Sequence, residues 1–295
     1  MHILVTGGTG FIGGALLPEL LSRGYRMTVL TRGSYSDSAA VRYVNALDAV
    51  EGKVDAVINL AGAGLAARRW SKSYKREIVD SRVGLTQHLV AWLERQQSSP
   101  QLLISGSAVG FYGQSLTQVF TEDSGPGEGF SAELCRQWEA AALTAESFIP
   151  QVALLRLGVV LDHGGGALQE MLKSFQFGIG SWLGSGNQWL SWIHRRDVVN
   201  AICFLLENPG IQGPLNLTAP RPVTHGELCS VVAKEFKWTL FSAGVPSPVM
   251  RLLVGEMADE LLLNGQRVEP QRLQQLGFVF EYPQLRDAFE NILRR

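Results

Sequence analysis

The stretch Thr6-Gly7-Gly8-Thr9-Gly10-Phe11-Ile12-Gly13 decides the fold of this chain. The apolar run Ile3-Leu4-Val5 comes directly before it, and an apolar, helix-like stretch, residues 11–21, overlaps its end and continues beyond it. A strand that turns through Gly-x-x-Gly-x-x-Gly into a helix brings free backbone N–H groups and the positive end of the helix dipole to one point. The first glycine permits the tight turn, the second lets a phosphate approach the backbone, and the third lets the helix pack closely on the sheet. The alternative is a glycine-rich turn that binds nothing.

A second signal follows the next strand and favours a bound dinucleotide. Residues 27–31 are predicted to form that strand, so Arg32 follows its carboxyl end. An acidic side chain at this place binds the ribose 2′-hydroxyl of NAD, whereas an arginine accommodates the 2′-phosphate of NADP. No Asp or Glu stands between Arg26 and Ser36. We therefore predict an NADP(H) site that includes Arg32, with a solvated loop arginine as the alternative. The residues of the turn that we expect at the cofactor are Gly7, Thr9, Gly10, Phe11, Ile12 and Gly13.

The composition argues against several other classes of protein. The chain has 295 residues, of which 46% are hydrophobic and 18% charged, and its formal net charge is −1. This balance, without a large cluster of Lys and Arg, argues against nucleic acid as the main partner. No uninterrupted apolar run approaches the roughly 20 residues of a membrane span. The cysteines Cys135, Cys203 and Cys229 lie far apart without metal-ligand spacing, so we expect no metal site and a cytoplasmic location.

Strand-like apolar runs alternate with helical patterns through about the first 160 residues. Nearly all-apolar strands in this arrangement are typical of a parallel sheet covered on both faces. We predict a Rossmann-type α/β fold, a doubly wound parallel sheet, with a smaller C-terminal α/β lobe. The dinucleotide-binding core is expected over residues 1–163, with returning elements near 191–218, and a mixed substrate lobe over 164–295. The predicted strands are 2–6, 27–31, 41–44, 54–60, 102–105 and 152–157. The predicted helices are 11–22, 71–95 and 131–145. We expect Pro18 to kink or locally open the first of these helices.

Further motifs carry a resemblance to a known family. They are Asn59-Leu60-Ala61-Gly62, Ser105-Gly106-Ser107 with Tyr112-Gly113, Leu155-Arg156 with Val160, and Trp192-Ile193-His194 with Asp197. Together with the glycine-rich turn they resemble the extended short-chain dehydrogenase/reductase superfamily, which includes nucleotide-sugar epimerases and reductases. The tail, residues 246–293, is similar to the small C-terminal domain of unknown function in one atypical branch. Members of that branch are called NAD(P)-dependent epimerase-family proteins, and some carry a cell-division-inhibitor label.

The resemblance implies further cofactor contacts. Leu60, Ala61 and Gly62 correspond to the family's loop beside the adenosine and pyrophosphate. Arg82 falls where relatives often have a cofactor-contacting asparagine, and Glu77, little more than a turn earlier, could reach a ribose hydroxyl or pair with a basic side chain. An ordinary solvated helix face is the alternative for both. Val160 corresponds to backbone that meets the nicotinamide amide, with a plain core valine as the alternative.

The family's usual catalytic pair is missing from this chain. In typical members, a tyrosine in Tyr-x-x-x-Lys moves the proton and the lysine lowers its pKa, while a serine hydrogen-bonds the substrate oxygen. Alignment of the helix by Trp138-Glu139 puts Ser131 at the tyrosine position and Cys135 at the lysine position. No tyrosine in the chain has a lysine four residues later.

Other residues remain as candidates for catalysis. Ser107 corresponds to the family's serine, and Tyr112 is the best alternative acid, although a packing role for Tyr112 is the competing interpretation. His194 is a further candidate in a segment that is largely structural in relatives. His163 and Cys135 are weaker ones. Trp182, Trp189 and Trp192 lie among glycines and suit either a substrate-facing wall or lobe packing.

Two functions compete. The first is an NADP-dependent oxidoreductase or epimerase-like enzyme acting on a small carbonyl or hydroxyl compound, and the retained Ser107 favours it. The second is a catalytically silent NADP(H)-binding sensor or scaffold, which the missing Tyr-x-x-x-Lys pair favours. We expect the enzyme. The expected partner is a small-molecule substrate, with no nucleic acid and no membrane. The resemblance also implies a homodimer through helices 71–95 and 131–145.

Overall fold

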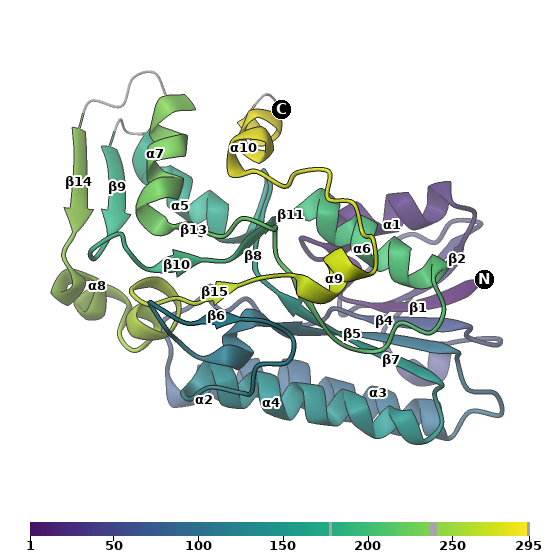
Figure 1. Cartoon of the computed structure of the whole chain (residues 1–295). Coiled ribbons are helices and arrows are strands. Elements are labelled where there is room, and N and C mark those ends of the chain that lie inside the picture. The colour runs from purple at the N-terminus through teal and green to yellow at the C-terminus, as the bar shows by residue number, and fades with distance from the viewer. Residues whose placement is uncertain (177–178, 236–240, 294–295) are drawn as a thin grey trace.

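The centre of the molecule is a parallel sheet of seven strands (Figure 1). The computed structural model describes residues 1–176, 179–235 and 241–293. The order of the strands reverses between β1 and β4, so that the loops after these two strands open to the same crevice. All neighbouring pairs are parallel, which confirms the predicted Rossmann-type sheet. Across the sheet the strands are β12 (Gly213–Leu217), β7 (Gln151–Leu157), β5 (Leu102–Ala108), β4 (Ala56–Asn59), β1 (His2–Thr6), β2 (Arg26–Leu30) and β3 (Val41–Val44).

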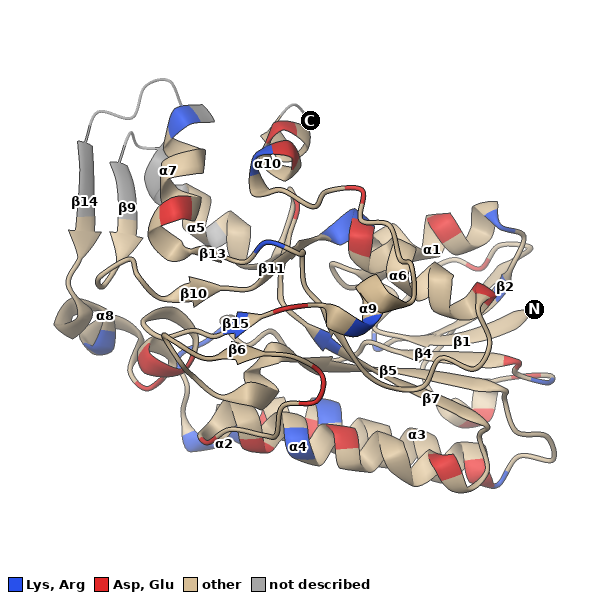
Figure 2. Cartoon of the chain, viewed as in Figure 1, with Lys and Arg blue, Asp and Glu red and all other residues tan. Residues whose placement is uncertain are grey.

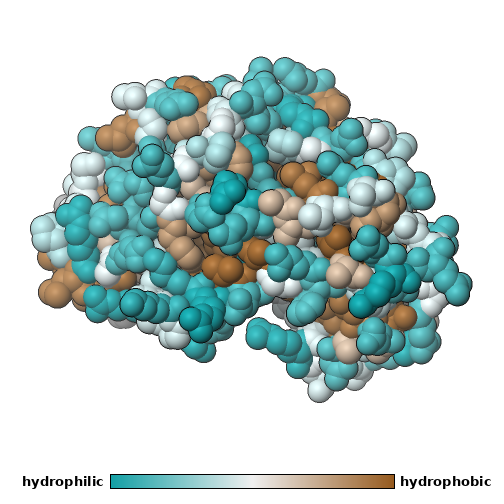
Figure 3. All heavy atoms as spheres, turned by 90° about the horizontal axis from the view of Figure 1, so that it is seen from below, coloured by the Kyte–Doolittle hydropathy of each residue, from teal (hydrophilic) through white to brown (hydrophobic). Residues whose placement is uncertain are grey.

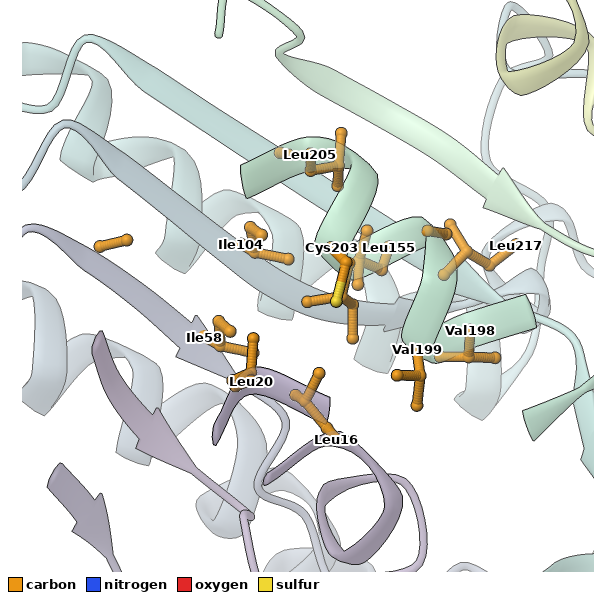
Figure 4. Packing of buried hydrophobic residues seen from close by; sticks show 14 of the residues in the cluster. Leu16, Leu20, Ile58, Ile104, Leu155, Val198, Val199, Cys203, Leu205 and Leu217 are labelled. Carbon is orange, nitrogen blue, oxygen red and sulfur yellow. The ribbon is translucent and has the colours of Figure 1, made fainter. Parts of the chain in front are cut away.

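Helices cover both faces of the sheet. One face carries α1 (Gly13–Ser22) and α6 (Arg195–Glu207), and the other carries α2 (Lys72–Val79), α3 (Leu85–Glu94) and α4 (Phe130–Leu143). Because successive strand residues point to opposite faces, Ile3 and Val5 belong to the core under α1 and α6, whereas Leu4 belongs to the core under α3 and α4. Figure 4 shows the first of these cores, where residues of α1 and α6 meet residues of the strands, among them Leu16, Leu20, Val198, Val199, Ile58, Ile104 and Leu155.

A smaller lobe lies beyond the carboxyl ends of the strands, at the end of the molecule opposite the N-terminus (Figure 1). Trp192, Leu168 and Leu228 are among the fully buried residues of its own core. The chain returns from this lobe to the central sheet through helix α6, residues 195–207, and the next strand, β12, lies beside β7. The lobe contains α5 (Gly166–Gln176), α7 (His225–Glu235) and three strand pairs: β8 (Val159–Leu161) with β11 (Trp192–His194), β9 (Ile179–Leu183) with β14 (Phe241–Val245), and β10 (Trp189–Leu190) with β13 (Val223–Thr224).

The C-terminal tail runs across both lobes. After α8 (Ser247–Val254) and a π-helical turn (Ala258–Leu262), β15 (Arg267–Val268) pairs with β6 (Val119–Phe120). The tail then forms α9 (Gln271–Gln275) and α10 (Leu285–Leu293). Its buried residues are shared among separate hydrophobic clusters, and the tail therefore ties the small lobe to the sheet. These residues are Met257, Val268, Leu273, Phe278, Leu285 and Phe289.

The main difference between the observed and the predicted helices lies within residues 71–95. The helix predicted over 71–95 is interrupted by a π-helical turn, Asp80–Gly84, which separates α2 from α3. Helix α1 continues through Pro18, and the kink or local opening expected there stays a prediction. Pro18 cannot donate to the carbonyl of Gly14, but Gly14 is exposed and water can satisfy that oxygen.

The surface is mixed in charge and polarity. Figure 2 shows Lys and Arg interspersed with Asp and Glu over α2 and α4. The face on that side, seen from below in Figure 3, is mainly hydrophilic with scattered hydrophobic residues. In the described ranges, no helix combines the length and the apolar character needed to cross a membrane. The homodimer through this face stays a prediction.

Candidate functional site

The glycines of the first turn fall into two groups. Gly7 has a φ of +70°, and a Cβ on it would lie 2.6 Å from the Leu60 carbonyl. A Cβ on Gly13 would lie 2.3 Å from the oxygen of Gly7. Both positions must therefore be glycine for the chain to pack on itself. Gly10 differs, because a Cβ there would meet only the Gly7 oxygen, at 3.2 Å, and its outer side is open. The turn therefore leaves an open backbone surface of the kind that a phosphate can approach.

Phe11 anchors the start of α1. In the described part of the chain, the backbone N–H groups of Phe11 and Ile12 have no protein acceptor, so these donors are available to a ligand. The Phe11 carbonyl accepts a hydrogen bond from Nη1 of Arg195 at 3.2 Å, and the guanidinium carbon lies 4.6 Å from the centre of the Phe11 ring. Arg195 in turn pairs with Asp162 at 2.7 Å. The start of α6 and the loop after β8 thus fix the turn, through a pair that sequence reasoning missed.

The ends of β1 and β4 are joined by buried hydrogen bonds. Thr6 Oγ1 donates to Asn59 Oδ1 at 2.7 Å and accepts from the backbone N–H of Ala61 at 3.2 Å. Asn59 Nδ2 also donates to Thr86 Oγ1, at 2.8 Å. The predicted residues of the loop after β4, 60–62, therefore lie beside the glycine-rich turn, in the crevice where the strand order reverses.

Other predicted cofactor residues lie in varied settings. Arg32 is exposed after β2 and forms no ion pair within the described ranges, so its guanidinium is available to a phosphate. Glu77 pairs with Arg68 at 3.5 Å, and both side chains are exposed. This contact agrees with the interpretation that Glu77 pairs with a basic side chain. Val160 is partly buried in β8, opposite Ile193 of β11, and packs against the core under α1 and α6.

Arg82 lies in the π-helical turn, against the loop after β4. Its Nη2 donates to the carbonyl of Ala63 at 2.9 Å, and its Nη1 donates to the carbonyl of Ile78 at 3.4 Å. A Cβ on Gly62 would lie only 2.8 Å from the guanidinium carbon. Burial lowers the pKa of Arg82 from its ordinary value. The π-helical turn thus brings a cation to the loop of the predicted cofactor site.

Ser107 and Tyr112 lie in one buried polar network. Ser107 Oγ donates to Glu139 Oε1 at 2.6 Å. Arg156 binds both oxygens of the Glu139 carboxylate, at 2.8 Å each, and its Nη1 donates to the Tyr112 hydroxyl at 2.9 Å. The Tyr112 hydroxyl donates to Asn216 Oδ1 at 2.6 Å. The structure therefore brings both predicted catalytic hydroxyls into one network, in which each hydroxyl donates its hydrogen to another side chain of the protein.

This network limits the chemistry of its hydroxyls. Because Ser107 donates its hydrogen to Glu139, only lone pairs remain for a substrate. Burial raises the pKa of Tyr112, opposed by the nearby Arg156 guanidinium. Sequence reasoning missed the roles of Glu139 and Arg156. Two features of the sequence could have indicated these roles. Arg156 is a charged residue inside the otherwise apolar strand 152–157, and Glu139 directly follows the apolar Trp138.

The weaker catalytic candidates have structural surroundings. Burial raises the pKa of Cys135 to about 11, which opposes the thiolate needed in a nucleophile. His194 accepts a hydrogen bond from the backbone N–H of Arg196 at 3.1 Å and caps α6. His163 is exposed. Trp192 is fully buried in the core of the small lobe. No cluster of metal-ligating side chains occurs among the residues that the structure describes.

A groove lies next to the buried network. It has a volume of about 660 Å³, and Tyr112, Phe120 and the glycine-rich segment 125–129 are among its lining residues. Glu260 from the tail forms part of the wall, where its carboxylate accepts from the backbone N–H groups of Phe130 and Ser131 at 3.2 and 3.1 Å. The tail thus caps α4 and borders this groove.

Known proteins resemble the whole chain. Residues 3–217 match the NAD dependent epimerase/dehydratase family, and residues 245–292 match a domain of unknown function, DUF1731. The chain is 40% identical to the chloroplastic epimerase family protein SDR39U1 homolog of Arabidopsis thaliana, over 100% of this chain and 87% of that protein. It is also 40% identical to the epimerase family protein SH2119 of Staphylococcus haemolyticus, over 99% of each.

A solved structure is similar over its full length. The crystal structure of human epimerase family protein SDR39U1 (isoform 2) with NADPH has a TM-score of 0.90 and 33% identity, and the match covers 100% of both chains. MoeE5 in complex with UDP-glucuronic acid and NAD has a TM-score of 0.81 at 21% identity, over 100% of this chain and 98% of that one, which indicates a shared fold alone. On the strength of these matches, this chain belongs to the NAD dependent epimerase/dehydratase family.

Proposed function

We propose that this chain binds NADP(H) at the turn between β1 and α1 and uses it as an oxidoreductase or epimerase-like enzyme on a small carbonyl or hydroxyl compound. The observation that carries the proposal is the open turn at Gly10, with the free N–H groups of Phe11 and Ile12 beside it. Exposed Arg32, one strand away, supports the phosphorylated form of the cofactor. The NADPH in the crystal structure of the human relative supports the same assignment.

Replacing Arg32 with alanine tests the preference for NADP(H). A charge-assisted hydrogen bond contributes roughly 1.5–3 kcal/mol, so R32A should weaken NADPH binding by about ten- to a hundredfold. NADH binding should barely change, because NADH has no 2′-phosphate. Isothermal titration of both nucleotides against both proteins measures the difference.

Arg26 provides the matched control for this experiment. It is also exposed on β2, but it stands at the opposite, amino end of that strand. R26A should bind both nucleotides as the wild type does. If R26A and R32A lost NADPH affinity equally, the effect would come from the change in net charge, and Arg32 would not belong to the site.

The chemistry assigned to the chain is a hydride transfer, which NADP(H) supplies when bound. Ser107 is the proposed contact to the reacting substrate oxygen. When substrate binds, the Ser107 hydroxyl turns from Glu139 to donate to that oxygen, while Glu139 stays paired with Arg156. Tyr112 is the proposed acid. Its high pKa suits a group that stays protonated at neutral pH.

Loss of NADPH absorbance with a panel of aldehydes, ketones, quinones and nucleotide sugars tests for net reduction, and chromatography of the nucleotide sugars tests for epimerisation, which consumes no NADPH overall. With any substrate found, S107A should lower kcat/KM by roughly ten- to a thousandfold, as expected for losing a hydrogen bond to an oxygen that develops charge. Y112F should show a smaller loss if Tyr112 is the acid. Full rates in both variants, with circular dichroism confirming their fold, would exclude both residues and leave His194 as the next candidate.

A silent NADP(H)-binding sensor or scaffold is the second candidate function. It is favoured by the engagement of the Ser107 and Tyr112 hydroxyls within the protein and by the missing Tyr-x-x-x-Lys pair. Tight NADPH binding without turnover of any compound in the panel would favour this function over the enzyme.

A further inference from the structure

We propose that Arg82 is a binding site for an anionic group of the substrate, a carboxylate or a phosphate, at the carboxyl ends of β4 and β5. The proposal rests on the proposed NADP(H) function, because the path of the cofactor decides which ligand reaches this cation. It narrows the substrate from small carbonyl or hydroxyl compounds in general to those that carry a negative charge.

Among the residues that the structure describes, Arg82 has no acidic partner, unlike two other arginines of the site. Arg156 pairs with Glu139, and Arg195 pairs with Asp162. Within the described ranges, Arg82 donates to the neutral carbonyls of Ile78 and Ala63, and no Asp or Glu forms an ion pair with it. A desolvated cation without a carboxylate is costly, so a site of this kind favours an anion brought by a ligand.

The surroundings of Arg82 place it at the ends of β4 and β5. Its guanidinium lies against Gly62, in the loop after β4, and 5.5 Å from the ring of Trp138 in α4. Trp138 in turn lies against the end of β5, because a Cβ on Gly106 would be 2.9 Å from its ring. Gly62 is exposed, so ligands can reach the loop that carries this contact.

The strand order indicates which ligand brings the anion. From Arg82 toward Arg32 the strands are β5, β4, β1 and β2, about 4.8 Å apart. The turn after β1 is the proposed pyrophosphate site, and Arg32 after β2 is the proposed site of the 2′-phosphate. The phosphates of the cofactor thus have partners at β1 and β2. Arg82 lies on the far side of the turn, where the nicotinamide end of the cofactor carries no phosphate and leaves room for a substrate anion.

Titration with small anions tests the proposal without a known substrate. Oxalate and inorganic phosphate are titrated by calorimetry into the wild type saturated with NADP⁺, into R82Q and into R76Q. Arg76 is the control, because it is an exposed arginine on the adjacent helix α2. We expect at least one anion to bind the wild type and R76Q, and R82Q to lose about tenfold or more in affinity. The NADPH affinity of R82Q, titrated in parallel, separates a substrate contact from the cofactor contact that the resemblance implies for Arg82.

Several outcomes would overturn the proposal. One is that neither anion binds the wild type, and another is that R82Q binds them equally well. A loss of NADPH and of 2′-phospho-ADP-ribose affinity in R82Q would assign Arg82 to the pyrophosphate instead. If R82Q does not fold, R82K replaces it, and retention of anion binding there supports the role of the charge, whereas complete loss in a folded R82K counts against it. If the wild type binds no NADPH, the proposed function fails, and the anion titrations without nucleotide still test Arg82.

Discussion

The E139Q variant should lose about 3–5 kcal/mol of unfolding free energy, because it leaves the Arg156 guanidinium buried without its counter-charge. Both side chains of this pair are nearly inaccessible, with exposed fractions of 5% for Arg156 and 6% for Glu139. The substitution preserves the shape of the side chain, so the effect reports the charge rather than a cavity. It also deprives Ser107 of a charged acceptor. Urea unfolding followed by fluorescence measures the loss.

Glu133 is the matched control on the same helix. It pairs with Arg136 at 2.6 Å, but both side chains are about half exposed, so water replaces the lost contact. E133Q should leave the unfolding midpoint unchanged. If E139Q unfolded at the same urea concentration as E133Q, the buried network would contribute nothing to stability, and its role in holding Ser107 would have to be abandoned.

The G10V variant should lose nucleotide binding, by at least about a hundredfold, while keeping the fold, because its side chain would fill the space where the pyrophosphate approaches the backbone. Inside the protein the new Cβ meets only the Gly7 oxygen, at 3.2 Å, which a shift of a few tenths of an ångström relieves. Titration with NADPH and a circular dichroism spectrum together separate binding from folding.

Gly14 gives the control for the glycine variant. It lies four residues later, in α1, and a Cβ there meets nothing within 4 Å. G14V should therefore bind NADPH like the wild type. A folded G10V protein that kept full NADPH affinity would show that the turn serves the fold only.

The fold was predictable because its signals are local. Strands β1 and β3 have the predicted bounds, since both are short runs rich in β-branched and other apolar residues. The glycines of the first turn were also predictable, because Gly7 and Gly13 are required by contacts within a few residues and by the loop after β4. The interruption of helix 71–95 was not predictable, because no proline or glycine marks the start of the π-helical turn at Asp80–Gly84.

The setting of the catalytic candidates depends on contacts between distant parts of the chain. Ser107 meets Glu139 across 32 residues, and Tyr112 meets Asn216 across 104 residues. No periodicity or spacing encodes such pairs, because they form only when β5, α4, β7 and β12 have packed. The sequence singled out both hydroxyls as candidates, but their hydrogen-bond partners required the tertiary structure.

Parallel calorimetric titration of the wild-type protein with NADPH and NADH is the direct test of an NADP(H) site at the turn between β1 and α1. We expect NADPH to bind about ten- to a hundredfold more tightly than NADH, because only NADPH carries the phosphate that Arg32 recognises. Equal affinities for the two nucleotides, or a failure of NADPH to bind, would contradict it.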